Sequence, residues 1–287
     1  MVVMRNVGRS QEVRRRVNRL LRDWGGSHCA DHGRERTHLD DLPTGDFVQP
    51  GIRKGRVPRE GYQRGWGLQF GQLKSQIESE LLFRQSFQSA AALSSWMSAE
   101  KRANLYLLLT RFLPKLEHRN VIEFGSYKGG TAVFMALVLR QTAPEAKVFA
   151  LDTFEGMPQT DKSIDAHNAG DFSDATLDDL QSVIKALDLT NLTPVKGLFQ
   201  ETFPSISEEF KFGLAHIDAD IYSSIKYAQD AAWPRMTRGG YIVYDDAGEP
   251  SCIGATEAVE ELIQERHIHS EQIWPHFVFR VGYDKDG

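Results

Sequence analysis

The sequence has few cysteines and no long apolar run. Its 287 residues include 2 cysteines, Cys29 and Cys252, so no disulfide framework is indicated and a reducing compartment is expected. No apolar run approaches the roughly 18 residues that a membrane-spanning helix needs, and no signal-peptide core follows the N-terminus. We therefore expect a cytoplasmic protein that has no membrane among its partners.

Two further absences narrow the fold and the ligand. No internal repeat is visible in the sequence, so a repeat architecture is not indicated. The G-x-G-x-x-G loop that cradles a dinucleotide pyrophosphate is also missing. A nicotinamide dehydrogenase is therefore disfavoured.

The net charge of −5 hides a difference between two parts of the chain. Residues 1–75 carry 15 Lys and Arg against 8 Asp and Glu, whereas the remainder carries 19 against 31. A basic arm on an acidic body can bind nucleic acid or an anionic surface. We favour a solvated or self-docking extension, because charge asymmetry bears on association and not on fold. Nucleic acid is therefore not among the partners that we expect.

Composition divides the chain near residue 70. Residues 1–24 interleave arginines with apolar side chains, which predicts a short amphipathic surface helix. Residues 25–68 are rich in Gly, Pro, Asp and Arg without a clear period, which predicts a partly irregular linker. We therefore expect a basic N-terminal extension over residues 1–70, containing a helix, and one large domain over residues 71–287.

Apolar strands and amphipathic helices alternate through this larger domain. Helical periodicity runs from about residue 72 to 116, and Ser98 is placed to cap a helix within it. Further helices are expected after residue 130 and over residues 177–189, 221–233 and 253–266. Strands are expected over residues 121–123, 147–152, 192–197, 212–218, 240–246, 268–273 and 277–281. This alternation predicts an α/β fold with a mostly parallel, seven-stranded sheet and helices on both faces.

The segment from Val121 to Thr131, VIEFGSYKGGT, joins the first strand to a helix. Gly125 and the pair Gly129–Gly130 allow positive φ and let a ligand approach the backbone. Glu123 lies two residues before the first glycine, so it suits a cationic or amine-bearing cofactor such as S-adenosylmethionine (SAM) better than a phosphate. An ordinary strand–helix turn explains the same residues equally well.

Carboxylates stand where several predicted strands end. Glu123 and Asp152 end the first two strands, and Asp218 and the pair Asp245–Asp246 end two later ones. Ligands of parallel α/β sheets bind at this edge. Asp152 is placed to accept hydrogen bonds from a ribose diol, and its alternative role is to cap a helix or turn.

Asp218, Asp245 and Asp246 would repel one another unless a cation joined them. Oxygen ligands suit a hard divalent ion such as Mg²⁺ or Ca²⁺. The alternative is that these acids cap helices, and Asp220 could cap the helix that begins at Ile221.

A polar segment over residues 157–174 has the length of an active-site lid. His167 within it could act as a general base or contact a substrate. A solvated loop histidine is the alternative.

Four motifs that occur in order resemble the macrocin O-methyltransferase family. They are IEFGSYKGGT at residues 122–131, LDTFEGMP at 151–158, HIDADIY at 216–222 and GGYIVYDD at 239–246. The family consists of class I SAM-dependent enzymes with a Rossmann-like fold that methylate sugar hydroxyls of natural products. The resemblance spans about residues 95–281 and leaves residues 1–70 without a counterpart.

The resemblance also implies roles for individual residues. Asp218, Asp245 and Asp246 match the magnesium ligands of the family, and Asp218 and His167 are the candidates for acceptor deprotonation. The positions expected to bind SAM are Met97, Glu123, Gly125, Ser126, Gly129, Gly130, Thr131, Asp152, Thr153, Gly197 and Phe199.

The expected function is O-methylation of a hydroxyl on a sugar or a glycosylated natural product, assisted by a divalent ion. One alternative is a catechol-type O-methyltransferase, for which Trp66, Trp96 or Trp233 could form aromatic walls. Another is a catalytically silent SAM- or nucleotide-binding module. The acceptor is a small molecule, and a homo-oligomeric assembly stays open.

Overall fold

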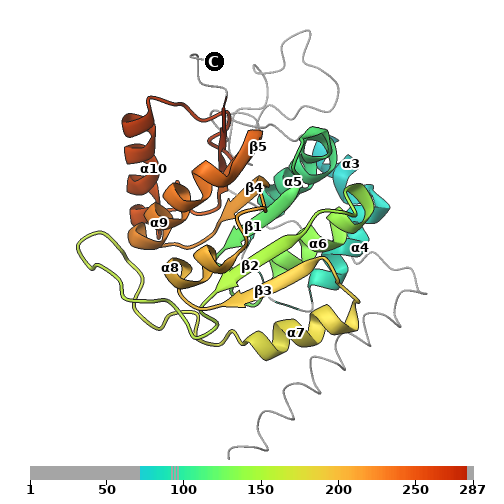
Figure 1. Ribbon diagram of the computed structural model, residues 1–287, viewed down its shortest axis with the longest axis horizontal. Coiled ribbons are helices and arrows are strands. Elements are labelled where there is room, and N and C mark those ends of the chain that lie inside the picture. Colours follow the sequence, from blue (N-terminus) through green and yellow to red (C-terminus); the bar gives the residue numbers. More distant parts are fainter. Residues whose placement is uncertain (1–71, 92, 94, 96, 283–287) are drawn as a thin grey trace, which may run out of the picture.

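A computed structural model describes residues 72–91, 93, 95 and 97–282 of the chain (Figure 1). The helix expected within residues 1–24 and the linker expected over residues 25–68 lie outside the described residues. None of the described helices is both long and apolar enough to cross a membrane.

A single six-stranded sheet forms the centre of the described part. The strand order is β3-β2-β1-β4-β5-β6, in which the first five strands pair in parallel and β6 runs antiparallel to β5. The strands are β1 (Asn120–Phe124), β2 (Val148–Asp152), β3 (Leu192–Lys196), β4 (Phe212–Ile217), β5 (Met236–Tyr244) and β6 (Phe277–Arg280).

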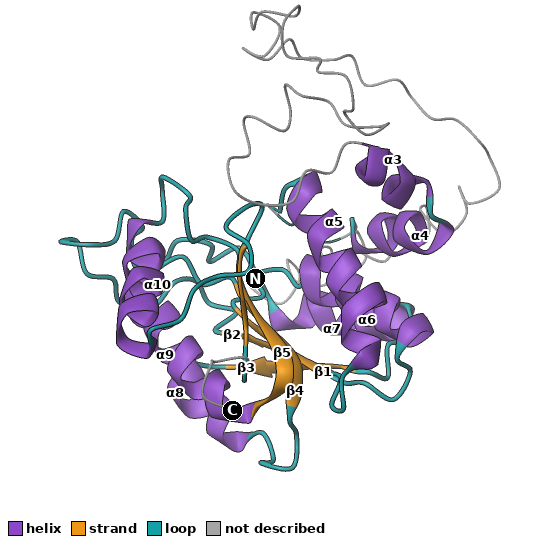
Figure 2. Cartoon of the chain, turned by 90° about the horizontal axis from the view of Figure 1, so that it is seen from above, coloured by secondary structure: helices purple, strands orange, loops and turns teal. Residues whose placement is uncertain are grey.

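Helices cover both faces of this sheet (Figure 2). One face carries the helices that precede β3, and the other carries those that follow it. The first group is α3 (Gln72–Ser79), α4 (Leu81–Ala90), α5 (Ala99–Leu107), α6 (Gly130–Thr142) and α7 (Leu177–Ala186). The second group is α8 (Phe199–Thr202), α9 (Tyr222–Ala232) and α10 (Ile253–Arg266).

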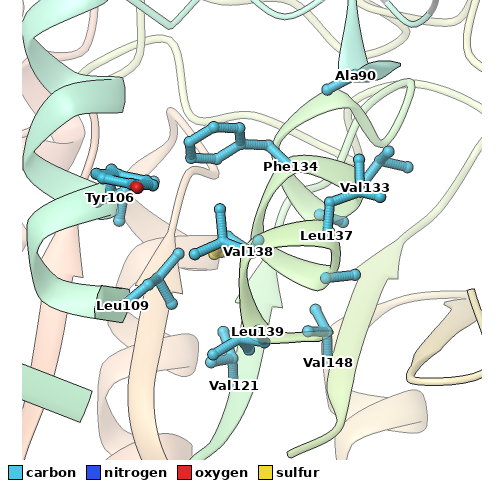
Figure 3. Close-up of a cluster of buried hydrophobic side chains, with 14 of the residues drawn as sticks. Ala90, Tyr106, Leu109, Val121, Val133, Phe134, Leu137, Val138, Leu139 and Val148 are labelled. Atoms are coloured by element: carbon cyan, nitrogen blue, oxygen red, sulfur yellow. The ribbon is translucent and has the colours of Figure 1, made fainter. Parts of the chain in front are cut away.

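Successive residues of the central strands enter opposite cores, because strand side chains alternate between faces. In β1, Val121 packs into the core under α6, whereas Ile122 packs into the core under α9. Both residues are fully buried, which explains why the strands read as nearly continuous apolar runs. Phe134 of α6 lies against Tyr106 in the first core (Figure 3).

The prediction of a helical region over residues 72–116 is confirmed, but the region is divided. Residues 91–98 separate α4 from α5, and a π-helical turn (Leu108–Phe112) and a 3₁₀ turn (Leu113–Lys115) follow α5. Ser98 caps α5 as expected, since its side chain accepts a hydrogen bond from the backbone N–H of Lys101.

The predicted strand count of seven is wrong for the described residues, which form six strands. Residues 268–273 make one isolated bridge, between Gln272 and Val278, in place of a strand. The chain turns back at once onto β6, where Glu271 donates its backbone N–H to the Val278 carbonyl at 2.8 Å. The short turn leaves no length for a separate ladder.

The strand order reverses between β1 and β4, which are neighbours in the sheet. A parallel α/β sheet opens a crevice at the carboxyl ends of its strands where such a reversal occurs. The fold therefore brings the residues that follow β1, β2, β4 and β5 to one edge, as the sequence predicts.

Candidate active site

A cavity of about 840 Å³ opens at this edge of the sheet. Small-molecule sites typically enclose roughly 300–1,000 Å³, so the volume suits a cofactor together with an acceptor. Residues that follow β1 and β2 line one part of the wall, and residues that follow β4 and β5 line another.

The loop between β1 and α6 is built around Gly125. This residue has φ +86°, and a Cβ placed on it would lie 1.7 Å from the Asp218 carbonyl oxygen. The loop can therefore pass this closely over the end of β4 only with glycine at this position. Ser126 follows, lines the cavity, and has a buried hydroxyl with no hydrogen-bond partner among the described residues. A polar ligand atom would satisfy that hydroxyl.

Asp152 fastens the same loop to the end of β2. Its Oδ2 accepts the backbone N–H groups of Ser126 at 2.9 Å and Tyr127 at 2.7 Å, and its Oδ1 accepts that of Phe154 at 2.7 Å. Burial raises the pKa of Asp152, although these hydrogen bonds oppose the shift. Asp152 therefore caps a turn, which is the alternative role that the sequence left open. Its Oδ1 can still accept a further hydrogen bond.

Glu123 does not reach the cavity. Its carboxyl is fully buried, and Oε1 lies 3.1 Å from Nδ1 of His216. Burial alone would lower the pKa of His216, but Asp245 and Glu123 raise it to about 9. Glu123 therefore pairs with an internal cation, and in this arrangement it makes no contact with a ligand in the cavity.

Most of the other predicted cofactor positions do line the cavity. They are Met97, Gly125, Ser126, Gly130, Thr131, Asp152, Thr153 and Phe199. Gly129 and Gly197 lie outside the lining and act through backbone shape, with φ +84° and +142°. Trp233 is not an aromatic wall, because it contacts Arg266 and does not line the cavity. Trp66 and Trp96 fall outside the described residues.

Asp218, Asp245 and Asp246 converge on the cavity as predicted, and we call them the three-aspartate cluster. One oxygen from each lies within 4.8 Å of the others. None of the three caps a described helix, so the capping alternative is wrong. Asp220 does not cap α9 either, because the N-cap position is Ile221 and the backbone N–H of Tyr222 donates to Asp165.

The pKa values of the three acids are shifted in different directions. Burial, which is the main cause, and repulsion from Asp245, which is the next, raise the pKa of Asp218 well above its usual range. Burial and repulsion from Asp220 and Asp245 do the same to the pKa of Asp246. A divalent ion would favour the ionised forms of both, so the donor set fits a hard cation.

Lys101 and His276 hold the remaining carboxylate, and sequence reasoning missed both. The Lys101 ammonium lies 2.8 Å from Oδ2 of Asp245 and 2.9 Å from Oε1 of Glu249. Nε2 of His276 lies 3.0 Å from Oδ1 of Asp245. Burial would raise the pKa of Asp245, but His216, His276 and Lys101 outweigh it and lower the pKa well below its usual range.

Residues 157–174 form a segment of turns without a helix or strand, and we call it the lid segment. Met157 donates its backbone N–H to the Asp171 carbonyl at 2.7 Å, which closes the segment on itself. Asp165 is buried, and its Oδ1 accepts the backbone N–H of Tyr222 at 2.9 Å, which caps α9.

His167 of the lid segment lines the cavity, as expected of a residue near the substrate. Its Nε2 lies 3.7 Å from both Sγ of Cys252 and Oδ1 of Asp220. These contacts argue against the solvated alternative, because they join the ring to two further groups in the cavity wall.

Comparison with known proteins assigns this arrangement to a family. A model of the macrocin-O-methyltransferase (TylF) family matches residues 97–274, which is more than half of the chain. The chain belongs to this family. The residues matched to the macrocin-O-methyltransferase family include strands β1 to β5 and end before β6, and they include residues from both sides of the cavity.

Curated relatives of the chain are O-methyltransferases by name. The chain is 26% identical to 8-demethyl-8-(2,3-dimethoxy-alpha-L-rhamnosyl)-tetracenomycin-C 4'-O-methyltransferase of Streptomyces olivaceus, over 46% of this chain and 54% of the relative. It is 27% identical to mycinamicin III 3''-O-methyltransferase of Micromonospora griseorubida, over 54% of this chain and 63% of the relative. The chain thus spans less than two thirds of the length of these relatives.

Two solved structures share the fold. The O-methyltransferase NovP superposes with a TM-score of 0.53 at 18% identity, over 62% of this chain and 78% of that chain. The calicheamicin methyltransferase CalS11 superposes with a TM-score of 0.53 at 19% identity, over 70% of this chain and 91% of that chain. At these identities the likeness establishes the Rossmann-like architecture and nothing finer.

Proposed function

We propose that the protein is a SAM-dependent O-methyltransferase that acts on a hydroxyl of a sugar or a glycosylated natural product. The observation that carries the proposal is one cavity that joins a glycine loop to the three-aspartate cluster. Membership of the macrocin-O-methyltransferase family and the names of the relatives support the reaction and the acceptor class.

The cofactor would be held by the residues that follow β1 and β2. SAM supplies an electrophilic methyl group when bound. The Ser126 hydroxyl is buried without a partner among the described residues, so it is available to a polar atom of the cofactor. Oδ1 of Asp152 is available to a ribose hydroxyl, while its hydrogen bonds to the loop keep the site in shape.

The three-aspartate cluster would hold a divalent ion, for which we propose Mg²⁺. Such an ion lowers the pKa of an acceptor hydroxyl and stabilises the alkoxide that develops. Lys101 and His276 fix both oxygens of Asp245, so this ligand is oriented before the ion binds. Asp218 is the least buried of the three acids, and we propose that it or His167 accepts the hydroxyl proton.

The test is methyl transfer from labelled SAM by the full chain, with rhamnosides and catechols as acceptors, in Mg²⁺ and in EDTA. We expect transfer to the glycoside, loss of turnover in EDTA, and recovery when Mg²⁺ is restored. Calorimetry should give SAM affinity in EDTA close to that in Mg²⁺, because the cofactor residues follow other strands. Full turnover in metal-free EDTA would overturn the role of the ion.

Two variants distinguish the effect of the three-aspartate cluster on turnover from the effect of removing any negative charge. Asp246→Asn should lower turnover strongly, whereas Asp230→Asn, on the exposed face of α9, should leave it unchanged. Transfer to catechol alone would favour the catechol-type alternative. SAM binding without transfer to any acceptor would favour the silent module.

A further inference from the structure

A second group of metal-ligating side chains lies in the cavity wall beside the three-aspartate cluster. It consists of His167, Asp220 and Cys252, which we call the cysteine cluster. The three residues come from separate segments, namely the lid segment, the turn after β4 and the residue that precedes α10. All three line the cavity, and the Cys252 side chain is buried.

The spacing of the three donor atoms matches a tetrahedral site. Nε2 of His167 lies 3.7 Å from Sγ of Cys252 and 3.7 Å from Oδ1 of Asp220. Sγ of Cys252 lies 3.5 Å from the same Asp220 oxygen. Zinc bonds of about 2.3 Å to sulfur and about 2.0–2.2 Å to nitrogen and oxygen, at tetrahedral angles, separate the donors by about 3.3–3.6 Å. An ion could therefore enter with only small movements of the three side chains.

The surroundings of His167 also fit a metal ligand. Its second ring nitrogen, Nδ1, lies 3.5 Å from Oδ2 of Asp171, four residues along the lid segment. Histidines that bind metals usually direct their second nitrogen to a carboxylate or carbonyl, which fixes the ring orientation. Asp220 is fastened from the other side, because its backbone N–H donates to Oδ2 of Asp246 at 3.1 Å.

We propose that the cysteine cluster is a binding site for a borderline-soft divalent ion of the zinc type, separate from the three-aspartate cluster. Thiolate and imidazole select such ions, whereas three carboxylates select Mg²⁺ or Ca²⁺. The Cys252 thiol releases its proton to solvent when the ion binds, because the thiolate is the ligand. The described residues supply three ligands, and the fourth position opens into the cavity, as in catalytic zinc sites. With Nε2 of His167 bound to the ion, Asp218 is the candidate that accepts the hydroxyl proton.

The test is titration of the metal-free full chain with Co²⁺, followed by absorption spectroscopy. Tetrahedral Co²⁺ bound to a thiolate gives a sulfur-to-metal charge-transfer band and intense visible bands. We expect both to saturate at a single ion per chain, to persist in a large excess of Mg²⁺, and to disappear on addition of Zn²⁺. This readout does not depend on methyl transfer, so its result is independent of whether the proposed function is correct.

Matched variants assign the signal. Cys252→Ser should abolish the charge-transfer band, whereas Cys29→Ser should retain it. His167→Gln should weaken Co²⁺ binding strongly, while His269→Gln, at an exposed position, should not. Asp171→Asn should weaken binding by about 10–100-fold, the usual effect of removing a carboxylate behind a ligating histidine.

Asp218→Asn removes a ligand of the three-aspartate cluster only, so it should leave the charge-transfer band in place. Absence of the band in the wild-type chain, or its loss in Cys29→Ser in place of Cys252→Ser, would overturn the proposal. Thermal unfolding of each metal-free variant shows whether a lost signal reflects lost folding. If Cys252→Ser unfolds, isothermal titration of His167→Gln with Zn²⁺ provides the deciding measurement.

Discussion

At the scale of single residues, Lys101 changes how the three-aspartate cluster is understood. Its buried ammonium contacts the buried carboxylate of Asp245 and the exposed carboxylate of Glu249, and it supplies one positive charge beside the cluster. Burial alone would lower the pKa of Lys101, but Asp245 and Glu249 raise it, so the side chain stays charged. The proposed divalent ion then has to balance mainly Asp218 and Asp246.

We predict that Lys101→Met destabilises the metal-free protein by up to about 3–5 kcal/mol, because removing one partner leaves a buried charge uncompensated. Mg²⁺ should raise the melting temperature of this variant more than that of the wild type, since the ion takes over the lost neutralisation. Thermal unfolding with and without Mg²⁺ measures both effects.

Lys226→Met is the control for this prediction, because Lys226 pairs with Glu265 at the surface of the fold. A change within about 0.5 kcal/mol is expected there. Equal losses in the two variants, with the same response to Mg²⁺, would contradict an internal charge-balancing role for Lys101.

Lys101 and the aspartates differ in how far their place in the site can be predicted from the sequence. Asp218, Asp245 and Asp246 end predicted strands, so topology alone brings them to one edge. Lys101 lies four residues before Leu105 on the buried stripe of α5, and a lysine in such a stripe was the available signal. Its partner Asp245 is 144 residues away, which periodicity cannot supply. The position of Glu123 outside the cavity lining was unforeseen for a related reason, because its partner His216 is on β4.

At the scale of elements, the β1–α6 loop depends on close backbone approach. Gly125 and Gly170 share φ +86°, but a Cβ on Gly125 would meet the Asp218 carbonyl, whereas one on Gly170 would meet nothing within 4 Å. Substitution of Gly170 therefore measures the cost of backbone strain alone, whereas substitution of Gly125 adds the cost of steric overlap.

We predict that Gly170→Ala costs about 1–2 kcal/mol, the usual cost of a left-handed conformation for a residue with a Cβ. Gly125→Ala should cost more than about 4 kcal/mol, which only severe substitutions reach, because β4 would have to shift as well. Urea unfolding measures both changes. Similar values for the two variants would mean that the loop moves away from β4 without difficulty.

The lid segment is held to the sheet domain by Asp165. Its Oδ1 caps α9 through Tyr222, and a Cβ on Gly254 would lie 2.2 Å from the same oxygen, so the carboxylate is packed against α10. We predict that Asp165→Ala costs about 0.5–2 kcal/mol as a lost helix cap. It should also speed hydrogen exchange throughout residues 157–174.

Asp161→Ala is the matched control, because the Asp161 carboxylate accepts its hydrogen bonds from Ser163, within the lid segment. Exchange should quicken only near residue 163 in that variant. Unchanged exchange across residues 157–174 in Asp165→Ala would show that other contacts hold the segment.

Elements were predicted best where periodicity is long and worst near the C-terminus. The helix over residues 253–266 matches α10, because its length leaves little ambiguity. Residues 268–273 also have an apolar pattern, but a short run cannot reveal that the chain turns back at Glu271 and pairs with Val278. The number of strands is therefore decided by a local turn that cannot be predicted from the apolar pattern.

At the scale of the whole molecule, two cores and one sheet edge explain the architecture. The alternation of strands and helices was sufficient to predict the α/β class, and the strand-end rule was sufficient to place the cavity. Among the described residues, those buried in the two cores lie between Ile77 and Val281. Residues 1–70 fall outside the described residues, so their contribution has to be measured.

We propose that residues 71–287 form the methyltransferase domain and that residues 1–70 are an appended extension. A chain that begins at Gly67 should therefore melt cooperatively and bind SAM with affinity close to that of the full chain, because it retains both described cores and the cavity lining. Calorimetry and thermal unfolding of the two chains provide the comparison, and sedimentation of both shows whether the extension alters assembly. Loss of the cooperative transition would mean that the extension completes a core or a subunit interface.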